Sequence, residues 1–107
     1  MPTVSKVGEY FFKGKSLKGG TRGNIVSLKV KNKVYLIGYG WAIYGINDLA
    51  TGDIIYYSKW WGYSPTTSKH LSQTGIARKY TILDSKIRPT TSDYGLPEMP
   101  SGGYSRY

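Results

Sequence analysis

The sequence contains no cysteine, and its 107 residues include a single histidine, His70. Without thiols the chain forms no disulfide, builds no thiolate zinc site and uses no cysteine nucleophile. The six carboxylates show no paired spacing of the kind that acid–base catalysis requires. Asp48 and Asp53 flank a segment of turn-forming residues, which explains them without catalysis. We therefore expect no enzymatic activity, no metal and no cofactor.

Long hydrophobic runs are also missing. The N-terminus lacks the apolar segment of about 7–15 residues that marks a signal peptide, and no run approaches the roughly 18 apolar residues of a membrane span. We expect no membrane association and an intracellular location. Aliphatic residues are few, with nine Ile, seven Leu and five Val. Aromatic side chains must then fill part of the core, since each buries about 150–250 Å².

Acidic residues are scarce, and the basic residues are unevenly placed within a formal net charge of +9. Residues 1–33 hold eight of the fifteen Lys and Arg and one of the six acids, a net of +7. Residues 34–107 carry a net of only +2. The basic third adjoins residues 35–63, which contain six tyrosines and all three tryptophans. Cations beside aromatic strands predict a surface for nucleic acid, with salt-sensitive binding.

Alternating apolar residues predict strands in the first half of the chain. In residues 25–31, Val26, Leu28 and Val30 alternate with polar residues, which is the period of a half-buried strand. A tight turn near Asn32 would then reverse the chain into the next strand.

Residues 33–61 are expected to form one large hairpin. Its first strand, residues 33–46, is long and would bend sharply at Gly38 and Gly40. Its second strand, residues 53–61, is rich in β-branched and aromatic residues.

The N-terminal segments give a weaker pattern. Residues 1–12 predict a first strand or a packed arm. Residues 13–24 hold four glycines and four cations without any period, and glycine makes regular structure costly. We expect a mobile basic loop there.

A short helix is expected after the hairpin. Thr66 or Thr67 would cap a helix over residues 68–73, and Gly75 would end it. Residues 76–83 alternate again and predict another strand.

The sum of these segments is one mainly β domain over residues 1–88. We expect a small curved sheet or barrel of about five strands, with at most one short helix. Residues 89–107 are rich in Pro, Gly and Tyr and predict an extended tail.

Six cations are the leading candidates for phosphate contact: Lys13, Lys15, Lys18, Arg22, Lys29 and Lys31. Lys29 and Lys31 would share one strand face with side chains about 7 Å apart, which matches the spacing of successive phosphates along one strand. The alternative is a solvated face whose lysines protect a sheet edge.

Aromatic residues are the candidates for base stacking. Alternate residues of the strand 53–61 point to opposite faces, so Trp60 and Trp61 would lie on different faces, and one face must be core. The other face would stack bases through Trp60 or Trp61 together with Tyr39. An exposed aromatic face would serve a protein interface equally well, and in a closed, covered barrel both faces would be buried.

The string Ser-Pro-Thr-Thr-Ser-Lys-His at residues 64–70 offers hydroxyls at a helix N-terminus followed by Lys69 and His70. Such an arrangement would contact an anion. Ordinary capping by the hydroxyls explains the same pattern, and a lone histidine is more often a structural residue than a catalyst.

The same string, preceded by Trp60-Trp61-Gly62-Tyr63, resembles a pattern in small uncharacterised proteins encoded by viruses and other mobile elements. The resemblance covers about residues 35–73. It implies a mobile-element origin, with the host cytoplasm as location if the source is viral, and it implies no activity and no functional residue.

The sequence thus predicts a small basic protein that binds nucleic acid, mainly through phosphates, with aromatic stacking. One alternative is a virus-encoded accessory protein that inhibits a host complex by binding an acidic or nucleic-acid-loaded partner. The other is a structural protein whose copies assemble through sheet edges, with the Tyr-rich tail reaching a neighbour.

Overall fold

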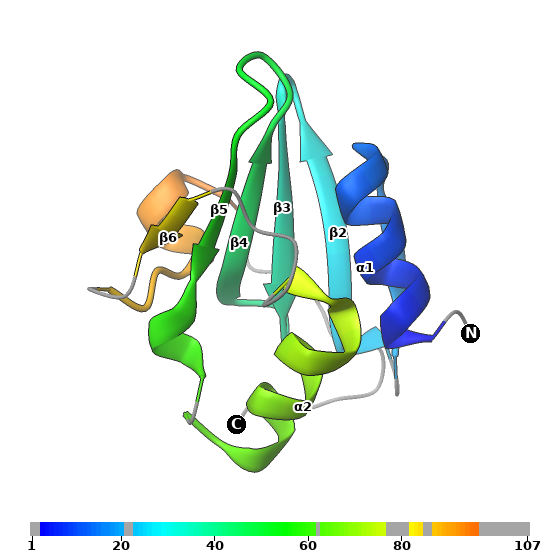
Figure 1. Cartoon of the computed structure of the whole chain (residues 1–107), viewed down its shortest axis with the longest axis vertical. Coiled ribbons are helices and arrows are strands. Elements are labelled where there is room, and N and C mark those ends of the chain that lie inside the picture. The colour runs from blue at the N-terminus through cyan, green and yellow to red at the C-terminus, as the bar shows by residue number, and fades with distance from the viewer. Residues whose placement is uncertain (1–2, 21–22, 62, 77–81, 85–86, 97–107) are drawn as a thin grey trace.

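A six-stranded sheet forms the centre of the protein, with strands in the order in which they occur along the chain (Figure 1). The computed structural model describes residues 3–20, 23–61, 63–76, 82–84 and 87–96. The strands are β1 Leu17–Gly19, β2 Ile25–Val30, β3 Lys33–Gly38, β4 Ala42–Asp48, β5 Ile54–Tyr57 and β6 Ile82–Asp84. Strands β1 to β5 are antiparallel, and β6 runs parallel to β5. The mainly β prediction is confirmed, and the sheet is open, with β1 and β6 at its edges.

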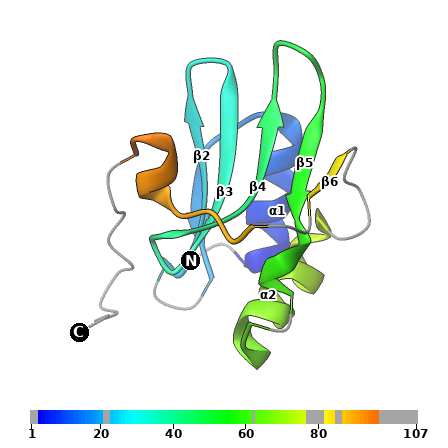
Figure 2. The same cartoon turned by 90° about the vertical axis from the view of Figure 1, so that its left-hand side faces the viewer.

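Two α-helices lie on one face of the sheet and a short 3-10 turn lies on the other. The helices are α1, Val4–Lys13, and α2, Pro65–Thr74, and the turn is η3, Thr91–Tyr94. Figure 2 shows the helices on one side of the sheet and η3 on the opposite side. Helix α2 lies in the connection from β5 to β6, as a parallel strand pair requires.

The first helix contradicts the expectation of a strand or arm at residues 1–12. The Thr3 side chain accepts a hydrogen bond from the Lys6 N–H at 3.2 Å and caps the helix. Gly14 ends the helix in the left-handed conformation, with φ 78°. Val7 and Phe11 lie four residues apart and are fully buried, so the apolar residues follow a helical period.

The second helix confirms the prediction of a helix ended by Gly75, whose φ is 80°. It begins earlier than expected. Ser64, rather than Thr66 or Thr67, is the cap, and Pro65 takes the first helical position. The described part of the chain thus contains the two helices α1 and α2, and the expectation of at most one short helix is wrong.

The basic segment 13–24 is more ordered than a mobile loop. Residues Leu17–Gly19 form β1 and pair with β2. Residues 21–22 lie outside the described residues. The hydrogen bonds of β1 to β2 fix Lys18 at one edge of the sheet.

The predicted strand at residues 25–31 is confirmed as β2, and a turn at Lys31 and Asn32 leads into β3. Lys31 adopts φ 57°, which is the left-handed region. It therefore belongs to the turn and does not share a strand face with Lys29, contrary to expectation.

The segment 33–61 is not one hairpin. A turn at residues 39–41 divides the expected long strand into β3 and β4, with Tyr39 at φ 56° and Gly40 at φ 82°. The expected last strand, residues 53–61, stops at Tyr57. The 3-10 turn η2, Ser58–Trp60, follows it.

A β-bulge in β4 re-aims Tyr44. Leu36 pairs with Gly45 and Ile37 pairs with Ile43, so Tyr44 is the extra residue. Its hydroxyl approaches Gly38, where a Cβ would lie 2.0 Å away. The bulge therefore directs the Tyr44 ring toward α2, where it contacts His70.

The C-terminal segment docks on the sheet as far as it is described. Thr91 N–H donates to the Trp41 carbonyl at 2.8 Å, and the Tyr94 ring lies 5.7 Å from that of Tyr35. Tyr94 also shares a hydrogen bond with Tyr57. Residues 89–96 are therefore not an extended tail, and residues 97–107 lie outside the described residues. The predicted strand 76–83 is wrong at Ile76, which is helical, and its last two residues lie in β6. Residues 77–81 lie outside the described residues.

The core lies on both faces of the central strands. All residues of β3 except Lys33 are buried, as are all residues of β4 except Asp48. The helices cover one face and η3 covers the other, so these strands lack the apolar–polar alternation of a half-exposed strand. Tyrosine and tryptophan fill much of this core: Tyr35, Tyr44, Tyr56, Tyr57 and Trp60 are buried.

Candidate functional site

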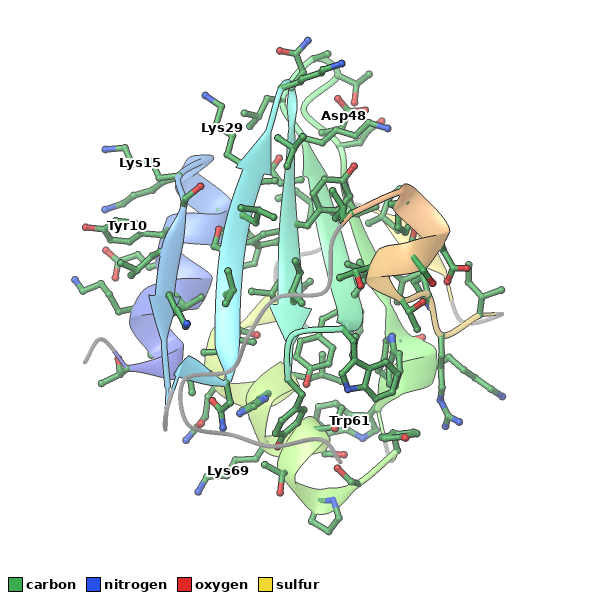
Figure 3. All side chains as sticks on the ribbon, turned by 180° about the vertical axis from the view of Figure 1, so that it is seen from behind. Tyr10, Lys15, Lys29, Asp48, Trp61 and Lys69 are labelled. Carbon is green, nitrogen blue, oxygen red and sulfur yellow. The ribbon has the colours of Figure 1, made fainter. Side chains whose placement is uncertain are left out.

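Two cations lie on neighbouring segments at the β1 edge of the sheet. Strand β1 begins at Leu17, which pairs with Ser27, and two side-chain hydrogen bonds extend the contact from there toward Lys15 and Lys29. Ser27 Oγ donates to the Lys15 carbonyl at 2.7 Å, and Ser16 Oγ accepts from the Lys29 N–H at 2.9 Å. Figure 3 shows both lysine side chains pointing outward on the same side of the molecule. The fold thus joins the glycine-rich basic segment to β2.

Two further lysines extend this edge. Lys18 is exposed on β1, and its stem lies over Gly23, where a Cβ would be 2.4 Å from Lys18 Cε. Lys31 is exposed in the β2–β3 turn. We call Lys15, Lys18, Lys29 and Lys31 the basic edge.

Lys13 lies beside this edge on α1, but its charge is compensated. Lys13 Nζ lies 3.1 Å from Glu9 Oε1, and Lys6 Nζ lies 3.7 Å from Glu9 Oε2. The hydrogen bond from Lys13 and the charge of Lys6 lower the pKa of the Glu9 carboxyl. Among the described residues these are the ion pairs, and Arg22 lies outside that part of the chain.

The remaining predicted site residues gather at the other end of the molecule, around α2. Trp61 and Lys69 are both exposed there, at the end of the molecule opposite Asp48 (Figure 3). Tyr39 reaches the same region from the β3–β4 turn, where its ring lies 5.2 Å from that of His70. The predicted residues therefore form two groups rather than one.

Trp60 is a core residue and does not offer a stacking surface. Its side chain is only 2% exposed, whereas Trp61 is 50% exposed. The Trp60 ring contacts those of Trp41, at 5.4 Å, and Tyr63, at 5.0 Å. Because η2 replaces strand here, the two tryptophans are not on opposite faces of a strand. Trp61 remains available for contact with a partner.

His70 is also buried, at 3% exposure, and does not contact an external anion. Its Nδ1 lies 3.3 Å from the Tyr44 hydroxyl in a hydrogen bond. Burial, with a smaller effect of Lys69, lowers the pKa of His70 to about 4, so the ring is neutral at pH 7. Burial raises the pKa of the Tyr44 phenol. The His70 ring, held by Tyr44, packs against the Tyr39 ring and fixes its position.

A cavity of about 400 Å³ opens beside these residues. The lining residues are Tyr39, Trp41, Tyr63, Ser64, Thr66 and Thr67, and we call this the aromatic cavity. They come from the β3–β4 turn, the segment after η2 and the first turn of α2. Tyr39 was expected as a stacking residue and the hydroxyls of residues 64–67 as an anion contact, whereas sequence reasoning missed Trp41 and Tyr63. In the sequence, the aromatic residues end at Tyr63 and the hydroxyl residues begin at Ser64. This adjacency could have indicated that the two sets form one site.

Cations flank the aromatic cavity. The Arg88 guanidinium lies 5.2 Å from the centre of the Tyr63 ring, and Arg88 Nε donates to the Lys59 carbonyl at 2.7 Å. Lys59 and Lys69 are exposed. The described residues that line the cavity include no acidic side chain.

Within the described ranges, no three His, Asp or Glu residues gather in a way that would hold a metal ion. None of the helices described is both long and apolar enough to cross a membrane. A scan against models of protein families, a search of curated proteins and a search of solved structures each gave no match.

Proposed function

We propose that this protein binds nucleic acid, with the phosphates held by the basic edge. The observation that carries the proposal is that two hydrogen bonds attach the segment carrying Lys15 to the strand carrying Lys29, next to the pairing of β1 with β2. Nucleic acid as partner implies an intracellular location.

Lys15 and Lys29 bring two like charges to neighbouring segments at this edge, on the same side of the molecule. Like charges on neighbouring parts of a sheet are unfavourable without an anion. Glu9, the nearest acid along the chain, is engaged by Lys6 and Lys13. A phosphate between the two ammonium groups relieves their repulsion and releases counterions from the nucleic acid.

The salt dependence of binding tests this proposal. Binding of a labelled single strand of about 12 nucleotides is measured from about 50 to about 300 mM salt. For a single strand the slope of log K against log salt is about −0.7 per phosphate contacted. The double variant Lys15→Gln/Lys29→Gln should reduce the magnitude of this slope by about 1.4.

Lys6→Gln/Lys13→Gln is the matched control, since it removes the same two charges from the neighbouring helix, where both lysines pair with Glu9. This control should change the slope much less. Equal slopes for the two double variants would show that binding depends only on the net charge of the protein and not on the basic edge. No binding at low salt would overturn the proposal.

The absence of binding at low salt would favour the protein-binding alternative, which one observation supports. Trp61, Tyr63 and Ile87 are large apolar side chains that are each about half exposed. Tyr and Trp are enriched at protein interfaces, and such residues supply most of the binding energy there.

A further inference from the structure

The aromatic cavity has the composition of a site for a flat heterocycle. Three of its lining residues are aromatic, Tyr39, Trp41 and Tyr63, and the other three, at the start of α2, carry hydroxyls. Rings offer stacking surfaces, and hydroxyls donate to or accept from the edge of a base. A volume of about 400 Å³ lies near the lower end of small-ligand sites, which suits one base rather than several.

The rings of the cavity are held in place by a second layer. Trp60 packs edge-on against Trp41 and Tyr63, with interplanar angles of 79° and 75°. His70 stacks on Tyr39 at an interplanar angle of 29°. The layer behind the rings is buried, so the rings lose little freedom when a ligand binds.

Tyr39 is held in an uncommon backbone conformation. Its φ of 56° lies in the left-handed region, which a bulky residue rarely adopts. The Tyr39 N–H donates to the Asn24 carbonyl at 2.8 Å, which fixes the turn. The position would be less strained with glycine, as at Gly40 next to it. Tyrosine at this position places a ring at the cavity at a cost in backbone strain.

The hydroxyl wall is partly rigid. Ser64 Oγ accepts from the Thr67 N–H at 3.1 Å and donates to Thr67 Oγ1 at 2.9 Å. Thr66 is exposed on the same turn. Behind the rings, the buried Trp60 indole N–H has no hydrogen-bond partner among the described residues. The site therefore combines fixed polar groups with stacking surfaces.

We propose that the aromatic cavity holds one unstacked base of a single-stranded nucleic acid, against the rings that line it, Tyr39, Trp41 and Tyr63. Arg88 lies over the Tyr63 ring, and the exposed Lys59 and Lys69 lie before and after the lining residues 63–67 in the sequence. These cations carry the charge that the phosphates on either side of the base require. In a duplex the base is paired and stacked, so the cavity selects single strands. This inference rests on the proposed function and adds a base-dependent contribution to it.

The test compares two strands that differ only in their bases. One is a labelled oligothymidylate of about 12 nucleotides, and the other has the same length and phosphates but no bases. The wild-type chain should bind the strand with bases about tenfold more tightly, as expected for one well-stacked base. Tyr63→Leu, at a side chain 48% exposed, should bring this ratio close to one.

Trp61→Leu is the matched control. Trp61 is 50% exposed and lies two residues from Tyr63, but it does not line the cavity. This variant should keep the tenfold ratio. Loss of the ratio in Trp61→Leu but not in Tyr63→Leu would place the base outside the cavity and overturn the inference.

The remaining outcomes separate this inference from the proposed function. Equal binding of the two strands by the wild-type chain overturns the base site and leaves the phosphate contacts standing. Binding of neither strand overturns the proposed function. Thymidine monophosphate should compete only weakly. Competition as strong as that of the whole strand would make a free nucleotide the ligand and overturn the assignment to a strand.

Discussion

At the residue scale, His70 shows how burial decides the role of a side chain. A basic residue and a histidine after three hydroxyls indicated an anion contact. In the structure α2 turns His70 inward, against Tyr44 and Tyr39, while Lys69 points to solvent. Trp60 and Trp61 differ in the same way, since Trp60 is buried and Trp61 is exposed. One of the two tryptophans was expected in the core, and the structure shows that it is Trp60, at the end of η2 rather than in a strand.

The histidine gives a prediction for the pH dependence of stability. Its pKa is about 4 in the folded protein and about 6.5 in the unfolded chain. As the pH falls below about 6.5, the unfolded chain binds a proton that the folded protein does not. Stability is therefore fully present above that pH and falls between about 6.5 and 4, by about 3 kcal/mol from this group.

Urea unfolding of the wild type and His70→Asn at several pH values between about 4 and 7 checks this. Asparagine keeps a polar group near the position of Nδ1 but does not titrate. The wild-type advantage in free energy of unfolding should shrink as the pH falls. An advantage that stays constant over the whole range would contradict the assignment.

At the element scale, the contact between α1 and α2 depends on a glycine. A Cβ at Gly8 would lie 2.3 Å from the Thr74 carbonyl oxygen and 2.7 Å from Thr74 Cα. Both are backbone atoms, so no side-chain rotation relieves the clash. The two helices approach each other closely only because residue 8 has no side chain.

Gly8→Ala should lower the free energy of unfolding by about 2 kcal/mol, because the helices must separate. Helix propensity alone predicts the opposite sign, since alanine is favoured over glycine by about 1 kcal/mol. Ser5→Ala, at an exposed position of the same helix, is the control and should change stability by less than about 0.5 kcal/mol. Chemical denaturation measures both. A Gly8→Ala variant as stable as the wild type would refute the close contact.

At the scale of the whole molecule, the C-terminal turn η3 packs on the face of the sheet opposite the helices. Tyr94 contacts Tyr35 of β3 and shares a hydrogen bond with Tyr57 of β5. Thr91 is bonded to the Trp41 carbonyl, in the turn that supplies two rings to the aromatic cavity. The segment expected to extend from the domain therefore stabilises the face of the sheet that the helices leave uncovered.

Tyr94→Ala should lower the free energy of unfolding by about 3 kcal/mol, from lost ring burial and the lost hydrogen bond. Ser92→Ala, at an exposed position of η3, should cost less than about 0.5 kcal/mol. Thermal or urea unfolding of the two variants measures the difference. If both variants match the wild type, η3 does not contribute to the core.

The sequence alone determined what depends on neighbours along the chain. The alternation in β2, the turn at Gly52 and the stop of α2 at Gly75 follow from local periods and backbone preferences. The scarcity of aliphatic residues also predicted an aromatic core. Helix α1 was missed because its valines and phenylalanines favour strands, although Thr3 and Gly14 carry its caps.

Only the tertiary structure decided which groups meet. The bulge at Tyr44, the contact of Lys15 with the β2 edge and the aromatic cavity each join segments that are distant in the sequence. The cavity brings the turn at residues 39–41 next to residues 63–67. No local sequence pattern predicts that two segments so far apart in the chain come into contact. Burial on both faces of β3 and β4 likewise depends on which segments cover the sheet, and this is a property of packing rather than of local propensity.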